Sequence, residues 1–511
     1  MKFRKAAVFL LLPALLLSGC AQELPDEGAA PLPGDLASLS SQKEEPSAAL
    51  PETFSLPYDS GAALDPVTCP DGAQQTLGAL LYEGLFQLDE ELEPQYRLCT
   101  DASYDPEAMT WTLQLREGVT FSDGSSLTAS DVAATLNRAR TAPRYQARLA
   151  CVQSVRAAKG TVVITLNRPN TGFTALLDIP IVKAGTENNS VPTGTGPYTL
   201  VSDSGNFYLA PNSSWWGSGK LPADRIELVP CTGSDALRYQ FTSHAVQLIT
   251  ADLTDSEPLS AAGSFSSTDA DTSVLQYIGF NVQRELLSDP AVRRALSLGV
   301  DRSTVADVYL SGHAVAAQFP VSPVSALYPA ELETGYSYNA FEDAMTDVGL
   351  NTGETTRELT LLVNDDNSFK VSIARYLASS LSVFDLKFTV ETLPWEDYLT
   401  ALAAGNYDLY FAEVRLTADW DLTALIGTGG QLNYSGWSDP AMDEILSACA
   451  ASQNQAASMR ALCVRLSSQA PILPVCFKRT SVLTQTGVAE GLSPTAADPF
   501  YNLEGITLHL A

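Results

Sequence analysis

The chain has 511 residues, of which 45% are apolar, and its 30 Lys and Arg against 59 Asp and Glu give a formal net charge of −29. This length is more than one hydrophobic core serves, so we expect a globular protein of two or three domains. The negative charge disfavours binding to nucleic acid and to anionic membrane surfaces, and it suits either simple solubility or the attraction of cationic ligands.

The N-terminus has the pattern of a secretory signal. Three basic residues precede the apolar run 6–17, which only Pro13 interrupts. A membrane helix needs about 20 apolar residues, so we expect a signal peptide instead. The run leads into Leu17-Ser18-Gly19-Cys20, which resembles a bacterial lipobox, whose Cys is acylated and becomes the first residue. We therefore predict a signal peptide at 1–19 and lipidation of Cys20; the alternative is an ordinary secretory signal with a chance Cys.

The next stretch, up to residue 53, is rich in Pro, Ala, Ser, Glu and Asp and has no apolar periodicity. Such a composition buries too little apolar surface to fold. We therefore predict that residues 20–53 are the lipidated Cys and a disordered tether.

Beyond Cys20 the chain has seven cysteines, no Cys-x-x-Cys and only three His, so we predict no metal site and no cofactor. Disulfides are permitted outside the cytoplasm, but seven is odd, so at least one thiol stays unpaired within the chain. Most of the seven should be small buried residues, and the sequence assigns no pairs.

Local patterns in the first half predict a scaffold. Met109–Arg116 and Gly160–Leu166 alternate as half-buried strands do, and Thr128-Ala-Ser-Asp131 is a capping-box start of a helix. The glycine-rich run Pro192–Tyr198 lacks the Lys and the helix start of a phosphate-binding loop, so we expect a structural turn. Tandem tryptophans, Trp215-Trp216, could stack on a ligand, but we expect them to pack within their own domain.

The middle of the chain predicts a strand followed by two helices. Residues 275–282 form a β-type run, and Asp289-Pro290 is a good N-cap with a first helical residue. A second helix start follows at Asp301 or Ser303, with an expected stop at Gly312.

From residue 359 onward, strand and helix patterns alternate. We predict strands at 359–363, 387–393 and 407–414, and helices at 369–381 and 395–405. This β-α-β-α-β order implies an α/β lobe with a largely parallel sheet.

Several stretches resemble, in order, motifs of the peptide- and nickel-type solute-binding proteins of bacterial ABC importers, the extracellular solute-binding protein family 5. They are Leu81–Leu85, Leu115–Val132, Pro192–Tyr198, Trp215–Leu228, Tyr277–Arg302, Leu432–Asp443, Gln469–Val475 and Asp498–Leu508. An ordered set of motifs is harder to match by chance than any one of them. The resemblance covers residues 54 to 511 approximately.

The resemblance implies an α/β fold of the periplasmic-binding-protein-like type II class, with two α/β lobes joined by a hinge and an extra small α+β domain. It implies lobe I at 54–84, 191–275 and 484–511, extra domain II at 85–190, and lobe III at 276–483. The chain would cross between the lobes near Tyr277–Asn281 and return near Lys478–Val482. Ligand would favour the closed form by touching both lobes.

Catalytic signatures such as His-Glu-x-x-His and Gly-x-Ser-x-Gly are missing, and His244, His313 and His509 lie in unrelated segments. With the resemblance, we expect binding rather than catalysis. It implies a monomeric, lipid-anchored, extracytoplasmic protein that captures a short peptide in the interlobe cleft and delivers it to a membrane permease. Two alternatives stay open. The cargo could be a nickel chelate or another non-peptide solute, or the protein could be a tethered sensor that serves no transporter.

The candidate ligand site lies between Tyr407 and Trp437. In peptide-binding members of the family, a Gly-Trp pair and an Asp follow a Tyr-Asp strand, and that Asp pairs with the peptide's amino terminus. Here Tyr407-Asp408 is present and Ala418-Asp419-Trp420 matches the acidic step, but Glu413-Val-Arg-Leu416 replaces Gly-Trp, which weakens the peptide assignment. The candidate ligand-binding residues are Asp419, Trp420, Glu413, Arg415, Tyr434 and Trp437.

Asp419 is the central candidate, because open α/β sheets place ligands beyond the ends of their strands. The alternative is a solvated or helix-capping carboxylate. Asp421 stands equally well before the next helical residues, which frees Asp419 for a ligand.

Overall fold

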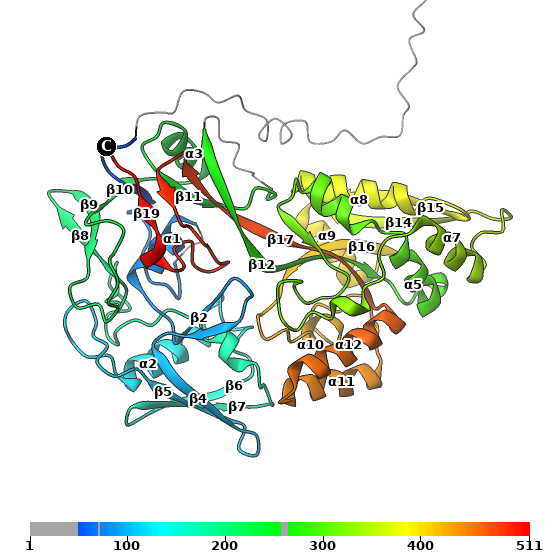
Figure 1. Cartoon of the computed structure of the whole chain (residues 1–511). Coiled ribbons are helices and arrows are strands. Elements are labelled where there is room, and N and C mark those ends of the chain that lie inside the picture. The colour runs from blue at the N-terminus through cyan, green and yellow to red at the C-terminus, as the bar shows by residue number, and fades with distance from the viewer. Residues whose placement is uncertain (1–49, 70–71, 257–263) are drawn as a thin grey trace, which may run out of the picture. The chain divides into compact units, whose positions relative to one another are not determined.

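The computed structural model describes residues 50–69, 72–256 and 264–511 (Figure 1). The predicted signal peptide, Cys20 and most of the predicted tether lie outside the described residues. Within the described ranges, no helix is long and apolar enough to cross a membrane. Two four-stranded sheets and one seven-stranded sheet in this part of the chain organise separate hydrophobic clusters.

The first four-stranded sheet joins the beginning of the described chain to its end. Its strands, in spatial order, are β1 (Ser55–Tyr58), β10 (Ile226–Pro230), β9 (Asn206–Pro211) and β8 (Tyr198–Asp203). β1 is parallel to β10, and the other pairs are antiparallel. Helix α1 (Ala73–Leu81) shares a buried cluster with this sheet and with Phe500 and Ile506.

The glycine-rich turn is structural, as predicted. A Cβ atom on Gly194 would lie 2.1 Å from the carbonyl oxygen of Leu81, so the turn needs glycine for this close approach. The tandem tryptophans also pack within the protein, but Trp216 lies against Arg97 and Arg116 of the predicted extra domain II and not within its own predicted domain alone. Nearby, the buried carboxylate of Glu83 accepts hydrogen bonds from Trp215 Nε1 at 3.3 Å and Trp216 Nε1 at 2.8 Å. Both indoles are therefore bound within the protein.

The second four-stranded sheet is antiparallel throughout. Its strands, in spatial order, are β4 (Cys99–Asp105), β5 (Thr110–Leu115), β7 (Thr161–Leu166) and β6 (Val152–Ala158). β5 and β7 are the two alternating runs predicted as strands. Helix α2 (Ala129–Ala139) begins at the predicted capping box, where Thr128 N donates to Asp131 Oδ2 at 2.9 Å. A hairpin of β2 (Phe86–Leu88) and β3 (Pro94–Tyr96) precedes the sheet.

The seven-stranded sheet contains the predicted β-α-β-α-β unit. Its strands, in spatial order, are β11 (Leu248–Ala251), β17 (Ile472–Gln485), β12 (Phe265–Phe280), β16 (Leu409–Arg415), β14 (Arg357–Asn364) and β15 (Leu386–Leu393), with β13 (Ala314–Ala316) also paired to β17. β14 is parallel to β15 and to β16, as predicted. β12 pairs antiparallel with β16 and β17, so the whole sheet is mixed.

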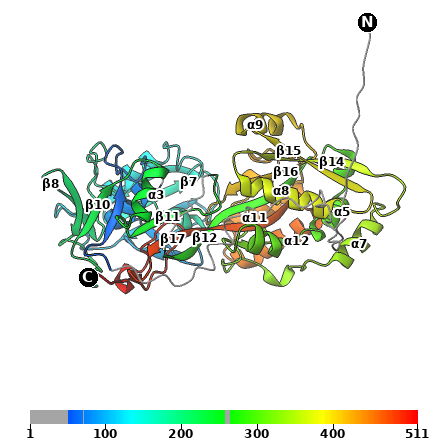
Figure 2. The same cartoon turned by 90° about the horizontal axis from the view of Figure 1, so that it is seen from above.

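Helices cover this sheet, and their ends follow the sequence signals. Helices α8 (Ser368–Leu381) and α9 (Trp395–Ala404) connect the parallel strands, and α8 lies against β14 and β15 (Figure 2). Helices α5 (Pro290–Leu298) and α11 (Pro440–Ala451) begin after Asp289 and Asp439, whose side chains accept from backbone N–H groups as the predicted caps do. Helix α12 (Gln455–Gln469) packs against α11.

The register of the antiparallel β12–β17 ladder shifts at two places near its middle, between Asp271 and Leu275 and again between Gln276 and Tyr277. At the first shift, Thr272 Oγ1 donates to the carbonyl oxygen of Lys478 at 2.6 Å while accepting from Val274 N at 3.0 Å. One half of β17 pairs with β11 and the other half with β13. The first shift lies a few residues before the crossing predicted at 277–281, and the second lies at its start.

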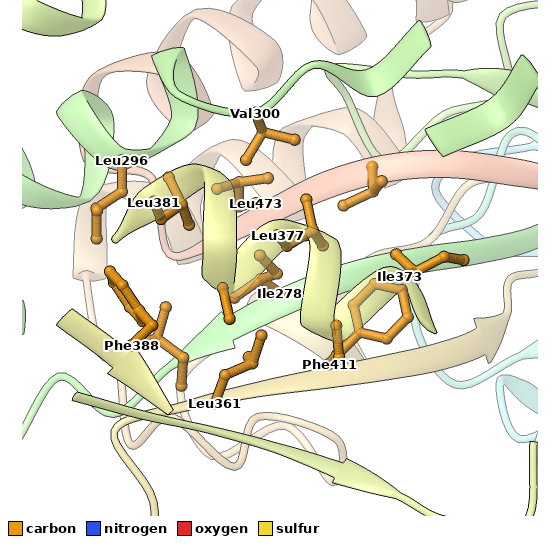
Figure 3. Close-up of a cluster of buried hydrophobic side chains, with 14 of the residues drawn as sticks. Ile278, Leu296, Val300, Leu361, Ile373, Leu377, Leu381, Phe388, Phe411 and Leu473 are labelled. Atoms are coloured by element: carbon orange, nitrogen blue, oxygen red, sulfur yellow. The ribbon is translucent and has the colours of Figure 1, made fainter. Parts of the chain in front are cut away.

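One hydrophobic cluster fills the space between α8 and the sheet. Leu377 and Leu381 recur at helical spacing and lie against Ile278 and Phe411 from β12 and β16 (Figure 3). All four side chains are at most 1% exposed. This cluster fixes α8, and with it the loop between β14 and α8.

Leu377→Ala should lower the free energy of unfolding by about 2–5 kcal/mol, because it leaves a cavity in a packed core. Arg375→Ala, on the exposed face of the same helix, should change it by less than about 0.5 kcal/mol. The measurement is denaturant-induced unfolding followed by circular dichroism. Equal losses in the two variants would contradict the packing of this face of α8.

Candidate functional site

Asp419 lies in the turn between β16 and the short helix α10 (Thr423–Ile426). Its carboxylate accepts hydrogen bonds from Thr417 Oγ1 and from Asn170 Nδ2, the latter at 2.7 Å. Burial raises the pKa of Asp419 above its ordinary value, although the Thr417 and Asn170 bonds oppose that shift. Asp419 is therefore a desolvated carboxylate. In the hydrogen bonds described for it, the side chains that donate to it are neutral.

Asp421, rather than Asp419, accepts a hydrogen bond from the first backbone N–H of α10, whose N-cap residue is Leu422. Its Oδ1 accepts from Thr423 N at 3.0 Å, and its Oδ2 lies 2.7 Å from Arg168 Nη1. Burial opposes ionisation, but the bonds from Thr423 and the Arg168 charge together hold the pKa of Asp421 below its usual range. Asp419 is thus not needed as the helix cap.

The partners of both carboxylates come from a segment about 250 positions earlier in the chain, Arg168–Gly172, which follows β7. Thr171 N donates to the carbonyl oxygen of Ala450 at 2.9 Å, and Thr171 Oγ1 donates to that of Ser452 at 2.8 Å. A Cβ atom on Gly172 would lie 3.2 Å from Asp419 Cβ, so glycine permits this close approach. The segment joins the β4–β7 sheet to the turn after β16 and to the turn between α11 and α12.

A cavity of about 30 Å³ lies at this junction, with room for roughly two water molecules. It is lined from both sides by polar and apolar residues, among them Arg168, Asn170, Asp419, Trp420, Gln455 and Met459. Trp420 is 3% exposed, packs edge-on against Phe477, and has a backbone φ of 53°. Positive φ is rare for a bulky residue, and such strained positions cluster at functional sites.

Glu413 lies further back along β16, in a different cluster. Its Oε2 accepts from Gln276 Nε2 at 3.0 Å and lies 3.4 Å from Lys478 Nζ. Lys478, whose side chain is 2% exposed, also pairs with Asp252 at 2.5 Å. Burial alone would lower the pKa of Lys478, but Glu413 and Asp252 outweigh it and hold the pKa above its ordinary value. Glu413 is therefore already ion-paired within the chain.

The other candidates have different surroundings. Arg415 is exposed at the end of β16. Tyr434 is partly buried, with its ring edge-on to Tyr410 at 6.2 Å between centroids. Trp437 is 7% exposed and packs in the same hydrophobic cluster as Trp420. Trp420, Tyr434 and Trp437 thus belong to one hydrophobic cluster, Trp420 lines the cavity while Tyr434 and Trp437 do not, and Arg415 is open to solvent.

Sequence reasoning missed Arg168, Asn170 and Thr171. The available signal was Pro169-Asn-Thr-Gly172, a turn-forming run directly after a predicted strand. Loops at strand ends carry functional groups more often than strands do. Nothing in that run, however, indicates which distant residues it meets.

Among the described residues, no group of three or more His, Cys, Asp and Glu could hold a metal ion. Six of the seven cysteines are buried, as expected for small apolar residues, and Cys449 is partly exposed.

Comparisons with known proteins give one family. The model of the bacterial extracellular solute-binding proteins, family 5 (middle part), matches residues 93–433. The glutathione-binding protein GsiB of Salmonella typhi is 25% identical over 409 residues, which cover 76% of this chain and 76% of GsiB.

Solved structures agree on the fold. MppA, a periplasmic murein tripeptide-binding protein, has a TM-score of 0.72 at 19% identity, over 91% of this chain and 99% of MppA. A nickel ABC transporter structure from Bacillus halodurans has a TM-score of 0.71 at 20% identity, over 88% of this chain and 98% of that one. These matches confirm the predicted α/β fold of the periplasmic-binding-protein-like class.

The family model covers more than half of the chain, from residue 93 to residue 433 of 511. Proteins of this family bind small solutes outside the cytoplasm and work with ABC permeases, and the relatives found are solute-binding proteins rather than enzymes. This chain therefore belongs to the bacterial extracellular solute-binding proteins of family 5, the solute-capturing components of ABC importers.

Proposed function

We propose that this protein is a lipid-anchored binding protein whose cargo is a short peptide, and that Asp419 binds the free amino group of that peptide. The observation that carries the proposal is the partly buried Asp419 carboxylate beside a cavity at the carboxyl end of β16. A desolvated carboxylate favours a cationic partner, and the end of a strand in an α/β sheet is where such folds bind ligands.

The relatives support a peptide-like cargo. GsiB is named for glutathione and MppA for a murein tripeptide. Both ligands carry amino and carboxylate groups, which charged side chains recognise by opposite charge. Arg415, exposed at the end of β16, suits the carboxylate end of such a ligand.

The aromatic candidates have a supporting part in this proposal. Trp420 and Trp437 are buried and Tyr434 partly so, which suits a rigid wall behind the ligand more than a freely exposed stacking face. Glu413 is ion-paired with Lys478 near the interruption of β12 and β17. A ligand that reaches this cluster would meet charged groups from β16 and β17 together.

A nickel chelate is the second candidate cargo, because Glu413-Val-Arg-Leu416 replaces the Gly-Trp of peptide-binding members and a nickel transporter shares the fold. Isothermal titration with glutathione, with an unmodified tripeptide mixture and with nickel–histidine separates the two cargoes. Loss of peptide uptake on deletion would separate an importer from a tethered sensor.

Asp419→Asn should weaken binding of glutathione or the tripeptides about ten- to a hundredfold, because it removes a charge-assisted bond of roughly 1.5–3 kcal/mol. Since burial raises the pKa of Asp419, wild-type binding should fall as the pH drops through that raised value, and the variant should lack this pH dependence. Asp347→Asn, an exposed change on α7 (Tyr338–Asp347), is the matched control. Equal affinities of wild type and Asp419→Asn would remove Asp419 from the site.

Ligand should also reduce the radius of gyration, because a ligand that touches both lobes favours the closed form. Small-angle X-ray scattering with and without saturating ligand measures this. An unchanged radius at saturation would argue against closure about the β12–β17 crossing.

Cys20→Ser should release the protein from the membrane fraction, because the acyl anchor would be lost. Fractionation of cells that express wild type or variant measures this. The lipobox interpretation fails if the variant still sediments with membranes.

A further inference from the structure

The segment Arg168–Gly172, called here the latch segment, presents one donor to Asp419 in a fixed orientation. Asn170 is 5% exposed, and its Oδ1 accepts from Gly172 N at 3.0 Å. Its backbone oxygen accepts from Trp111 Nε1 at 3.1 Å. These two bonds aim Asn170 Nδ2 at Asp419 Oδ2, 2.7 Å away. A neutral amide therefore occupies the acceptor that the proposed function gives to a ligand's amino group.

The remaining contacts of the latch segment can break at low cost. The Arg168 side chain is 45% exposed in its pair with Asp421, and exposed ion pairs contribute little and are screened by salt. Thr171 adds hydrogen bonds to the backbone oxygens of Ala450 and Ser452, which water can replace. The hydrogen bonds and the ion pair of the latch segment to the turn after β16 and to the turn between α11 and α12 are thus all polar contacts, whereas Phe173, directly after the segment, is buried in the hydrophobic cluster of the β4–β7 sheet.

Charge decides which donor Asp419 prefers. A charged donor binds a carboxylate more strongly than a neutral amide does, so an ammonium group competes well with Asn170, whereas a hydroxyl or amide does not. Asn170 Nδ2 already lies 2.7 Å from Asp419 Oδ2, and the adjoining cavity of about 30 Å³ has room for only about two water molecules, so a ligand group at Asp419 needs the latch segment to move away. Occupation by ligand and closure of the latch segment are therefore alternatives.

We propose that the latch segment is an autoinhibitory strap: Asn170 is a built-in competitor for the Asp419 carboxylate, and a cationic ligand group releases the strap from the turn after β16. The competition with ligand rests on the proposed function. The hydrogen bond between Asn170 and Asp419 is independent of that function, because it can be tested on the protein without ligand.

The first experiment follows hydrogen exchange of the Thr171 amide, which donates across the contact to Ala450. Asn170→Ala removes the donor to Asp419 and should raise the exchange rate of this amide about fivefold, the factor that loss of one ordinary hydrogen bond allows. Asn170→Asp should raise it further, because two carboxylates would face each other. The control is Asn167→Ala, whose side chain donates to Ala150 within its own sheet unit. Unchanged protection of Thr171 in both Asn170 variants would overturn the strap.

The second experiment titrates glutathione into the same proteins. Asn170→Ala should bind about fivefold more tightly than wild type, since it lacks the competitor, and Asn167→Ala should bind as wild type does. Weaker or unchanged binding by Asn170→Ala would contradict the proposal that Asn170 competes with the ligand. Weaker binding would mean that Asn170 contacts the ligand, and unchanged binding that it has no effect on it.

The two readouts separate the inference from the function on which it rests. If wild type binds neither glutathione nor a tripeptide mixture, the proposed cargo is wrong, and the competition with it falls. Exchange at Thr171 then still decides whether Asn170 fastens the strap to Asp419.

Discussion

The fold depends on one buried ammonium group. Lys478 lies at the point where the β12–β17 ladder is interrupted, and its side chain is almost wholly excluded from water. A buried cation must be paired, and removal of one partner of a buried pair costs about 3–5 kcal/mol. Its partners are Asp252, just after β11, and Glu413, on β16. The two ion pairs thereby connect β17 to β16 and to the end of β11 at the place where the β12–β17 ladder is interrupted.

The same place shows how the ladder survives its interruption. The hydroxyl of Thr272 satisfies a backbone oxygen on β17 and a backbone N–H on its own strand, so the polar groups freed by the register shift stay hydrogen-bonded. Close by, the buried side chain of Asn367 donates to the backbone oxygen of Thr254 at 3.0 Å, which ties the start of α8 to the loop after β11. Side-chain hydrogen bonds thus replace regular pairing along this line.

Much of the fold follows from local chemistry that the sequence displays. The Asp–Pro starts of α5 and α11, the glycine after α9 and the alternating strands β5 and β7 each depend on a few adjacent residues, so they could be predicted. The order of motifs then led to the family. The combination of parallel and antiparallel strands in the seven-stranded sheet could not be predicted in this way, because β12 and β17 pair across about 200 residues.

The candidate site could be predicted only in part. Asp419 stands out because it follows a strand end, and Asp421 beside it caps the next turn as the spacing allowed. Asn170 does not stand out in the sequence, because the residue that it hydrogen-bonds, Asp419, is 249 positions away. Glu413 looked available because its sequence neighbours are ordinary, yet a lysine from another strand neutralises it. Trp437 stays a predicted ligand contact, and its burial to 7% exposure, which depends on distant residues, could not be predicted.

Gly172 leaves just enough space for the latch segment to pack against Asp419 and Gln455. A methyl group at position 172 would lie 3.1 Å from Gln455 Nε2 and 3.2 Å from Asp419 Cβ, so it enters only if these side chains shift by a few tenths of an ångström. Any larger residue at position 172 would act as a wedge, and the displacement would reach Asn170 two residues earlier through the bond from Gly172 N to Asn170 Oδ1. The size of the side chain at position 172 therefore controls how well Asn170 Nδ2 is aligned with Asp419 Oδ2, although residue 172 takes no part in that hydrogen bond.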